Sequence, residues 1–82
     1  MRWTLHYHPT VIHYLISLGD AGSRLRRFIE YLQFDPSLNG WAMHKPKTNY
    51  WEICVEEHVV LYELREERQE IAILLVKPYS EL

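Results

Sequence analysis

The sequence predicts an α+β fold, in which an N-terminal strand and a helical hairpin are followed by an antiparallel sheet of three to four strands, with the hairpin packed on one face. Residues 2–7 alternate between apolar and polar side chains, residues 9–32 repeat apolar side chains at helical spacing, and residues 50–77 hold three β-rich segments. Helices and strands that are segregated along a chain indicate the α+β class. With 82 residues the chain is too short for two hydrophobic cores, so we expect one domain over residues 1–82.

The N-terminal segment reads as a half-buried strand. In RWTLHY the side chains of Trp3, Leu5 and Tyr7 fall on one face, and polar side chains fall on the other. Pro9 ends the strand, because proline lacks a backbone donor and suits the first position of a helix. We expect this strand to lie beside the last strand or at an edge of the sheet.

Two helices follow. The first is expected over Pro9–Leu18, with Gly19 at its C-terminal end. Asp20 or Ser23 is a candidate N-cap for the second helix. The core-facing stripe of the second helix is predicted from residues spaced i, i+3, i+4 and i+7, namely Leu25, Phe28, Ile29 and Leu32.

The rest of the chain is predicted to form strands. A short strand is expected at residues 41–44, and three longer ones at residues 50–56, 58–64 and 71–77. Residues 71–76 are continuously apolar, which indicates a central strand, and the polar residues 65–69 suit a hairpin turn. In the strand at 50–56 the side chains of Trp51, Ile53 and Val55 are expected to face the core. The order is β-α-α-β-β-β, with the short strand as an addition.

This order and the segment KPKTNYWEICVEEHVVLYELREERQEIAILLVK resemble the RelE/ParE superfamily of bacterial toxins. Residues 50–55 resemble the family strand "LWELRV", and residues 58–64 resemble "YRVIYEI". The Leu-x-x-Asp-Pro pattern at residues 32–36 is also typical. The resemblance implies a cytoplasmic toxin that a cognate antitoxin neutralises, and that either cleaves mRNA on the ribosome or inhibits DNA gyrase. The arginines usual in the ribonuclease branch are absent, because Cys54 and Val59 occupy their positions.

The resemblance leaves a small set of candidate catalytic residues. Lys45 and Lys47 stand where the family has its "KLK" lysines, Lys77 stands in the tail, and Tyr79 matches a terminal tyrosine. Cleavage needs cations for the phosphate charge and groups that transfer protons. The lysines could supply the positive charge that offsets the phosphate. His58 or His44 could transfer protons, and the ring of Tyr79 could stack on a base. The alternative is that the lysines are ordinary solvated residues of the link and that His58 only ends a turn.

Candidate nucleic-acid contacts are Lys45, Lys47, Arg24 and Arg27. The formal net charge of −2 makes any such contact local, since phosphate binding usually requires a basic balance. Arg24 and Arg27 share one face of the second helix, where the alternative is a solvated face balanced by Glu30. The function therefore stays open between a ribonuclease toxin and a non-catalytic binding module on the same fold, either a gyrase inhibitor or a degenerate toxin.

The composition also gives expectations about cofactors, metals, disulfides and cellular location. We expect no cofactor and no metal, because His6, His8 and His13 lack a further ligand at a characteristic spacing. The single cysteine, Cys54, excludes an internal disulfide and is expected to be structural. No signal peptide or membrane-spanning run is apparent, so we expect a soluble cytoplasmic protein. The three tryptophans are expected mainly in the core, although one exposed tryptophan could anchor a partner.

Overall fold

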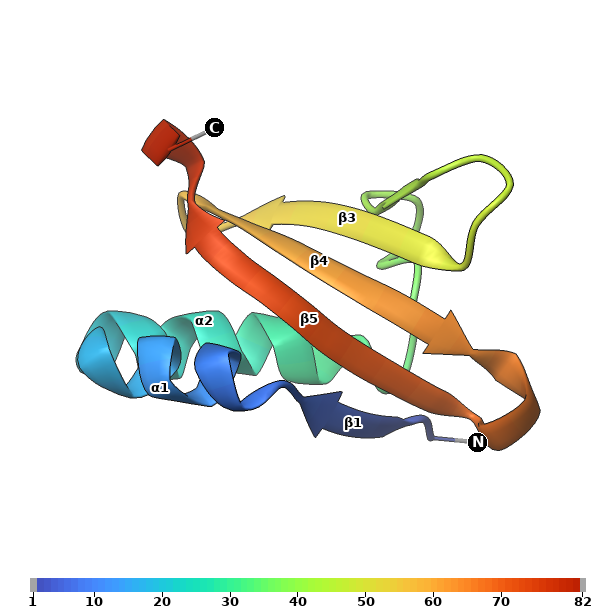
Figure 1. Cartoon of the computed structure of the whole chain (residues 1–82), viewed down its shortest axis with the longest axis horizontal. Coiled ribbons are helices and arrows are strands. Elements are labelled where there is room, and N and C mark those ends of the chain that lie inside the picture. Colours follow the sequence, from blue (N-terminus) through green and yellow to red (C-terminus); the bar gives the residue numbers. More distant parts are fainter. Residues whose placement is uncertain (1, 82) are drawn as a thin grey trace.

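In the computed structural model, which describes residues 2–81, two helices cover one face of a five-stranded sheet (Figure 1). The elements of residues 2–81 are β1 (Thr4–Tyr7), α1 (Pro9–Ser17), α2 (Asp20–Tyr31), β2 (Met43–His44), β3 (Tyr50–Val55), β4 (His58–Arg65) and β5 (Glu70–Pro78). Short 3₁₀ turns span Glu66–Arg68 and Tyr79–Glu81. The predicted α+β class and element order are confirmed. No helix within residues 2–81 is long and apolar enough to span a membrane.

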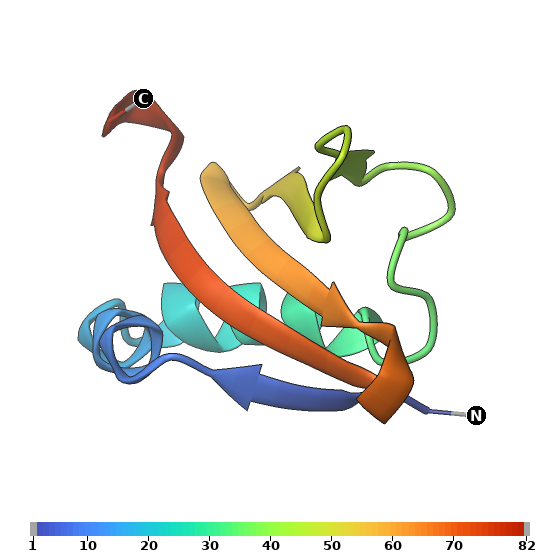
Figure 2. The same ribbon diagram turned by 45° about the vertical axis from the view of Figure 1, so that its right-hand side comes forward.

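The sheet combines the predicted antiparallel strands with the N-terminal strand. Its order is β1-β5-β4-β3-β2, and β1 runs parallel to β5 while the other neighbours are antiparallel. Strands β2 to β5 therefore form an antiparallel sheet of four strands, as predicted, and the N-terminal strand β1 joins it in parallel as a fifth strand, which makes the whole sheet mixed. The parallel pair follows from the helical hairpin, which carries the chain back across the sheet before the meander begins (Figure 2). β1 is both at an edge and beside the last strand, as predicted.

The core lies between the helices and the sheet. Leu25, Ile29 and Leu32 of the second helical segment are fully or almost fully buried against β4 and β5. Ile53 belongs to this core, and Trp51 and Val55 pack against it, as the alternation predicted. Phe28, the remaining member of the predicted stripe, is 40% exposed, so its assignment to the core is wrong. Its position on the helix, one residue before Ile29, turns it toward the edge of the helical face.

The junction between the two helices depends on glycine. Gly19 follows the end of α1 with a φ of +62°, a left-handed conformation that suits glycine. It is also the N-cap of α2, and no side chain caps this helix, so the expected caps Asp20 and Ser23 are wrong. Gly22 is buried where α1 and α2 cross, and an added Cβ would collide with the backbone carbonyl of Leu15. The two helices therefore cross more closely than they could with any residue other than glycine at position 22.

The turn between β3 and β4 is made by Glu56 and Glu57. Both have a positive φ, of 49° and 61°. Two left-handed residues between paired strands form the hairpin turn that normally uses Asn-Gly. The left-handed conformation is costly for a residue with a Cβ. This turn is therefore a strained part of the sheet, and it holds the start of β4 in place.

Candidate functional site

The sequence-predicted site residues fall at two ends of the β3–β4 hairpin. The backbone N–H of Lys45 donates to the carbonyl of Tyr50 (3.0 Å), where β3 begins. His58 pairs with Val55, where β3 ends. Because strand residues are spaced at about 3.3 Å, these two points lie roughly 17 Å apart. The structure therefore does not bring all the candidates into one constellation.

Lys45 is partly neutralised where it lies. Its Nζ is 3.3 Å from a carboxylate oxygen of Glu52, and both side chains are partly exposed. Lys47 is exposed in the following loop, where its φ of 64° places it in the left-handed region. A partly exposed ion pair is weak, so the Lys45 ammonium can exchange Glu52 for another anion at low cost. Neither lysine side chain is therefore held in one position by buried partners, as it would be in a preformed phosphate site.

Lys77 lies on the sheet face that the helices leave open. It pairs with Val59 in β4, which in turn pairs with Cys54 in β3. Val60 and Val76, one position along, belong to the core, so the alternation of β-strands turns Lys77 to the opposite face. Cys54 and Val59, the neighbours of Lys77 in this row across the sheet, add no cation to it.

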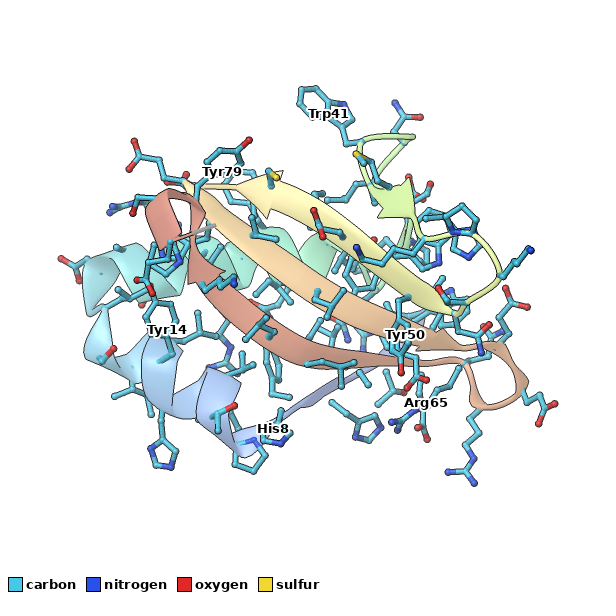
Figure 3. All side chains as sticks on the ribbon, turned by 45° about the horizontal axis from the view of Figure 1, so that its top comes forward. His8, Tyr14, Trp41, Tyr50, Arg65 and Tyr79 are labelled. Atoms are coloured by element: carbon cyan, nitrogen blue, oxygen red, sulfur yellow. The ribbon has the colours of Figure 1, made fainter. Side chains whose placement is uncertain are left out.

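His58 and Tyr79 come together in a cleft of about 500 Å³ at the end of the sheet. The cleft is lined by residues from α1, the β3–β4 turn and the C-terminal end of β5: Tyr14, Leu18, Glu57, His58, Pro78, Tyr79 and Ser80. Figure 3 shows Tyr14 and Tyr79 at this end of the molecule, with Tyr50 and Arg65 at the other. The backbone N–H of Tyr79 donates to the carbonyl of Glu57 (2.8 Å), which ties the tail to the turn.

The imidazole of His58 is held by two hydrogen bonds. Its Nδ1 lies 2.7 Å from the backbone carbonyl of Glu56, and its Nε2 lies 2.8 Å from the Tyr14 hydroxyl. A carbonyl can only accept, so we assign the proton of the neutral ring to Nδ1. Nε2 then accepts from the Tyr14 hydroxyl.

The hydrogen bond from Tyr14 links helix α1 to His58 inside the cleft. Partial burial raises the pKa of the Tyr14 hydroxyl, and the carboxylate of Glu81 raises it further. The Tyr14 hydroxyl therefore stays protonated at neutral pH and donates its hydrogen bond to His58. The contact joins residues 44 positions apart in the chain, and the sequence offered no signal for it.

The arginines of α2 lie on an exposed helix face. The Nε of Arg24 is 4.0 Å from a carboxylate oxygen of Glu56 in the β3–β4 turn. The carboxylate that balances this face is therefore Glu56 and not the expected Glu30. Among the ion pairs of residues 2–81, none includes Arg27.

The histidines near the N-terminus have local partners. His6 lies 3.7 Å from the Glu70 carboxylate, and His8 is the N-cap of α1, where Nδ1 accepts from the N–H of Thr10 (3.2 Å). Within residues 2–81 no group of three or more metal-ligating side chains comes together.

A second hollow, which the sequence did not predict, lies between α2 and β3. It has a volume of about 380 Å³, and its walls include Phe28 and Tyr31 from α2 and Trp41 from the following loop. Ile53, Cys54 and Val55 of β3 form the other side. Trp41 is 79% exposed and projects from the molecule in Figure 3. Trp41 therefore lies outside the core and is exposed, as a tryptophan that anchors a partner has to be.

Comparisons with known proteins identify the fold. No family model and no curated protein matches the sequence. Among solved structures, the archaeal RelE of the RelE–RelB complex from Pyrococcus horikoshii is 19% identical with a TM-score of 0.80, over 100% of both chains. An arginine-to-alanine double mutant of Escherichia coli toxin RelE in the free state is 12% identical, with a TM-score of 0.77 over 99% of this chain and 87% of that one.

A third structure is the toxin–antitoxin complex RelBE2 from Mycobacterium tuberculosis. Its matching chain is 14% identical, with a TM-score of 0.64 over 95% of this chain and 99% of that one. Identities this low establish the architecture and leave the chemistry to the residues of the site. This chain has the fold of the RelE toxins.

Proposed function

We propose that this chain is the toxin of a type II toxin–antitoxin system, neutralised by a cognate antitoxin and inhibiting translation by ribosome-dependent cleavage of mRNA in the cytoplasm. The observation that carries the proposal is the match to a RelE toxin over the full length of both chains. Two of the three similar structures are complexes of the toxin with its antitoxin, which supports an antitoxin as the partner of this chain.

In this proposal the cations and the proton-transfer groups work on different parts of the RNA. Lys45, Lys47 and Lys77 contact phosphates as single charges, without the bidentate geometry that arginine would provide. His58 transfers protons at the cleft, by way of the Tyr14 hydroxyl that occupies its Nε2. Tyr79 is 56% exposed beside them and offers its ring to a base.

One observation favours the alternative of a non-catalytic binding module, a gyrase inhibitor or a degenerate toxin. The open sheet face carries Glu52 against Lys45, and it has Cys54 and Val59 where the ribonuclease branch has arginines. Val59 is only 4% exposed, so its position is closed to solvent as well as uncharged. A face built in this way stabilises a pentacovalent phosphate poorly.

Controlled expression in bacteria separates the two functions. We expect the wild-type chain to arrest growth and translation, and primer extension to reveal ribosome-dependent mRNA ends. Lys45→Ala with Lys47→Ala should reduce both effects, and so should His58→Gln. Arg68→Ala is the matched control, since Arg68 is an exposed cation in the turn before β5.

The outcomes differ clearly. Growth arrest without mRNA ends, accompanied by loss of DNA supercoiling, would replace cleavage by gyrase inhibition. Normal growth with a stably folded chain would rule out the toxin proposal. A short neighbouring open reading frame whose product relieves the arrest would support the antitoxin partnership under either mechanism.

A further inference from the structure

Two hydrogen-bond donors without an acceptor lie where β1, α1 and α2 meet. The Tyr7 hydroxyl, at the end of β1, is buried, and within residues 2–81 it has no hydrogen-bond partner. The guanidinium of Arg26 lies over the Tyr7 ring, 5.7 Å from its centroid, and none of the ion pairs of residues 2–81 includes Arg26. A guanidinium can only donate, so it cannot accept the proton of the Tyr7 hydroxyl. A buried polar group without a partner is rare in a folded protein, and this one needs an acceptor from elsewhere.

The Tyr7 hydroxyl keeps its proton at neutral pH. Burial raises the pKa of Tyr7; the Arg26 guanidinium lowers it and the Glu30 carboxylate raises it, and the net change is a rise. Glu30 lies four positions after Arg26 on α2 and is exposed, and no ion pair joins the two within the described part of the chain. Glu30 therefore acts on Tyr7 from a distance and does not supply the missing acceptor.

A hollow of about 200 Å³ opens beside these two donors. Its walls combine three aliphatic side chains with the phenol and the guanidinium: Tyr7, Ile12, Leu15, Ile16 and Arg26. Ile12 and Ile16 are 44% and 72% exposed, although both are large and apolar. A neighbouring hollow of about 300 Å³ shares Leu15, Ile16 and Arg26 and extends to Gly19. The site therefore offers apolar contact area next to two donors that lack an acceptor.

An anionic acceptor with an aliphatic tail fits these features together. Among the described residues that line either hollow, only Arg26 is charged, so the charge next to a ligand is positive. Two acids of α2, Asp20 and Glu30, line neither hollow. A carboxylate accepts hydrogen bonds from a phenol and from a guanidinium, and its two oxygens match the guanidinium fork. The chemistry of the walls thus selects a carboxylate over a cation or a neutral ligand.

We propose that this site binds a free carboxylic acid with a short aliphatic chain. Its carboxylate accepts hydrogen bonds from the Tyr7 hydroxyl and from Arg26. The tail lies across Ile12 and Ile16 and removes their apolar surface from water. Arg26 is exposed on α2, so its guanidinium can turn from the Tyr7 ring to admit the ligand. The site shares no residue with the cleft at His58, and the inference does not depend on the proposed function.

Titration with simple carboxylates tests the site directly. Octanoate, added to the full chain at millimolar concentration, should shift the amide resonances of Tyr7, Ile16 and Arg26. Hexanoate should bind several-fold more weakly and acetate not measurably, because each buried methylene strengthens binding by up to about fourfold. Octylammonium, which has the same tail and the opposite charge, should bind at least about tenfold more weakly than octanoate, since it meets Arg26 as a like charge.

Conservative variants separate the charge from the hydroxyl. Arg26→Gln should weaken octanoate binding at least about tenfold, because it removes a charge-assisted hydrogen bond. Arg27→Gln is the matched control, since Arg27 is an exposed cation at the next position of α2, and it should leave binding unchanged. Tyr7→Phe should also weaken binding about tenfold. In the free chain the same substitution should leave the midpoint of urea unfolding unchanged or raise it, because the hydroxyl that it removes has no partner to lose.

Several outcomes would overturn the inference. Octanoate that does not bind, or that binds no better than octylammonium, would show that Arg26 and Tyr7 do not form a carboxylate site. A Tyr7→Phe variant that unfolds at a lower urea concentration would show that the hydroxyl already has an acceptor in the free chain, such as Glu30. Tighter binding by a short leucine peptide with a free C-terminal carboxylate would reassign the occupant to the end of a protein chain.

Discussion

Replacing Gly22 by alanine tests how closely the two helices are packed. An added Cβ would lie 2.9 Å from the carbonyl carbon of Leu15 and closer still to its oxygen, both inside the 3.0 Å that real Cβ atoms respect. The obstacle is backbone, so no side-chain rotation relieves it. Helix α1 would have to retreat by about 1 Å or more to clear this oxygen, and a gap of about 1 Å forfeits about half of the dispersion energy in its contacts.

The magnitude follows from two opposing effects. Overpacking costs about 1–3 kcal/mol, and a clash with backbone falls in the upper part of that range, about 2–3 kcal/mol, while glycine to alanine inside a helix gains about 1 kcal/mol. We therefore expect Gly22→Ala to lower the free energy of unfolding by about 1–2 kcal/mol, which lowers Tm by roughly 5–15 °C in a domain of this size. Urea titration followed by circular dichroism, together with a thermal scan, measures both quantities.

Ser23→Ala is the matched control, because Ser23 is the next residue of the same helix and is exposed. It should be neutral or slightly stabilising, since alanine has the higher helix propensity. A Gly22→Ala variant at least as stable as the wild type would show that α1 and α2 do not pack as closely as described, and it would refute the reasoning.

Three further predictions concern stability. Tyr62→Phe removes the hydroxyl that donates to the Pro36 carbonyl, and it should cost about 1 kcal/mol in urea titration; an unchanged midpoint would contradict this. Glu57→Gly relieves a left-handed residue, and it should raise the unfolding free energy by about 1 kcal/mol; a loss of stability would contradict this. The Ser37 hydroxyl, followed by the backbone N–H of Asn39, lowers the pKa of Asp35 below 3.8. Its stabilising contribution is therefore present above pH 3.8 and lost as the pH falls through the lowered value. Tm should drop more steeply with acid in the wild type than in Asp35→Asn, and equal slopes would contradict the assignment.

The elements were predictable because their signals are local. Each pattern reports which side chains of one element are buried in the core. Examples are the alternation around Leu5, the helical spacing of Leu25 and Ile29, and the apolar run that begins at Ile71. Periodicity records how often a side chain returns to the buried face, so it needs no knowledge of the partner element. It did not foresee the strained Glu56-Glu57 turn, because neither residue type signals a left-handed conformation.

The candidate site was only partly predictable. The need for a proton-transfer group selected His58, the resemblance selected Tyr79, and the structure places both in one cleft. The resemblance also selected Lys45 and Lys47, which lie at the other end of β3, because residues that are close along the chain need not be close across the sheet. Tyr14, which holds the His58 ring, comes from a helix 44 positions earlier in the chain. No local pattern reports a contact over that separation.

The sequence by itself determined which segments are helix or strand, the α+β class and most of the buried face, because burial periodicity is written within each element. Only the tertiary structure decided that β1 pairs in parallel with β5 and that Phe28 leaves the core. It also decided that Phe28 and Trp41 line a common hollow beside β3. These outcomes depend on how elements distant in sequence pack against one another, which is settled only when the whole chain has folded.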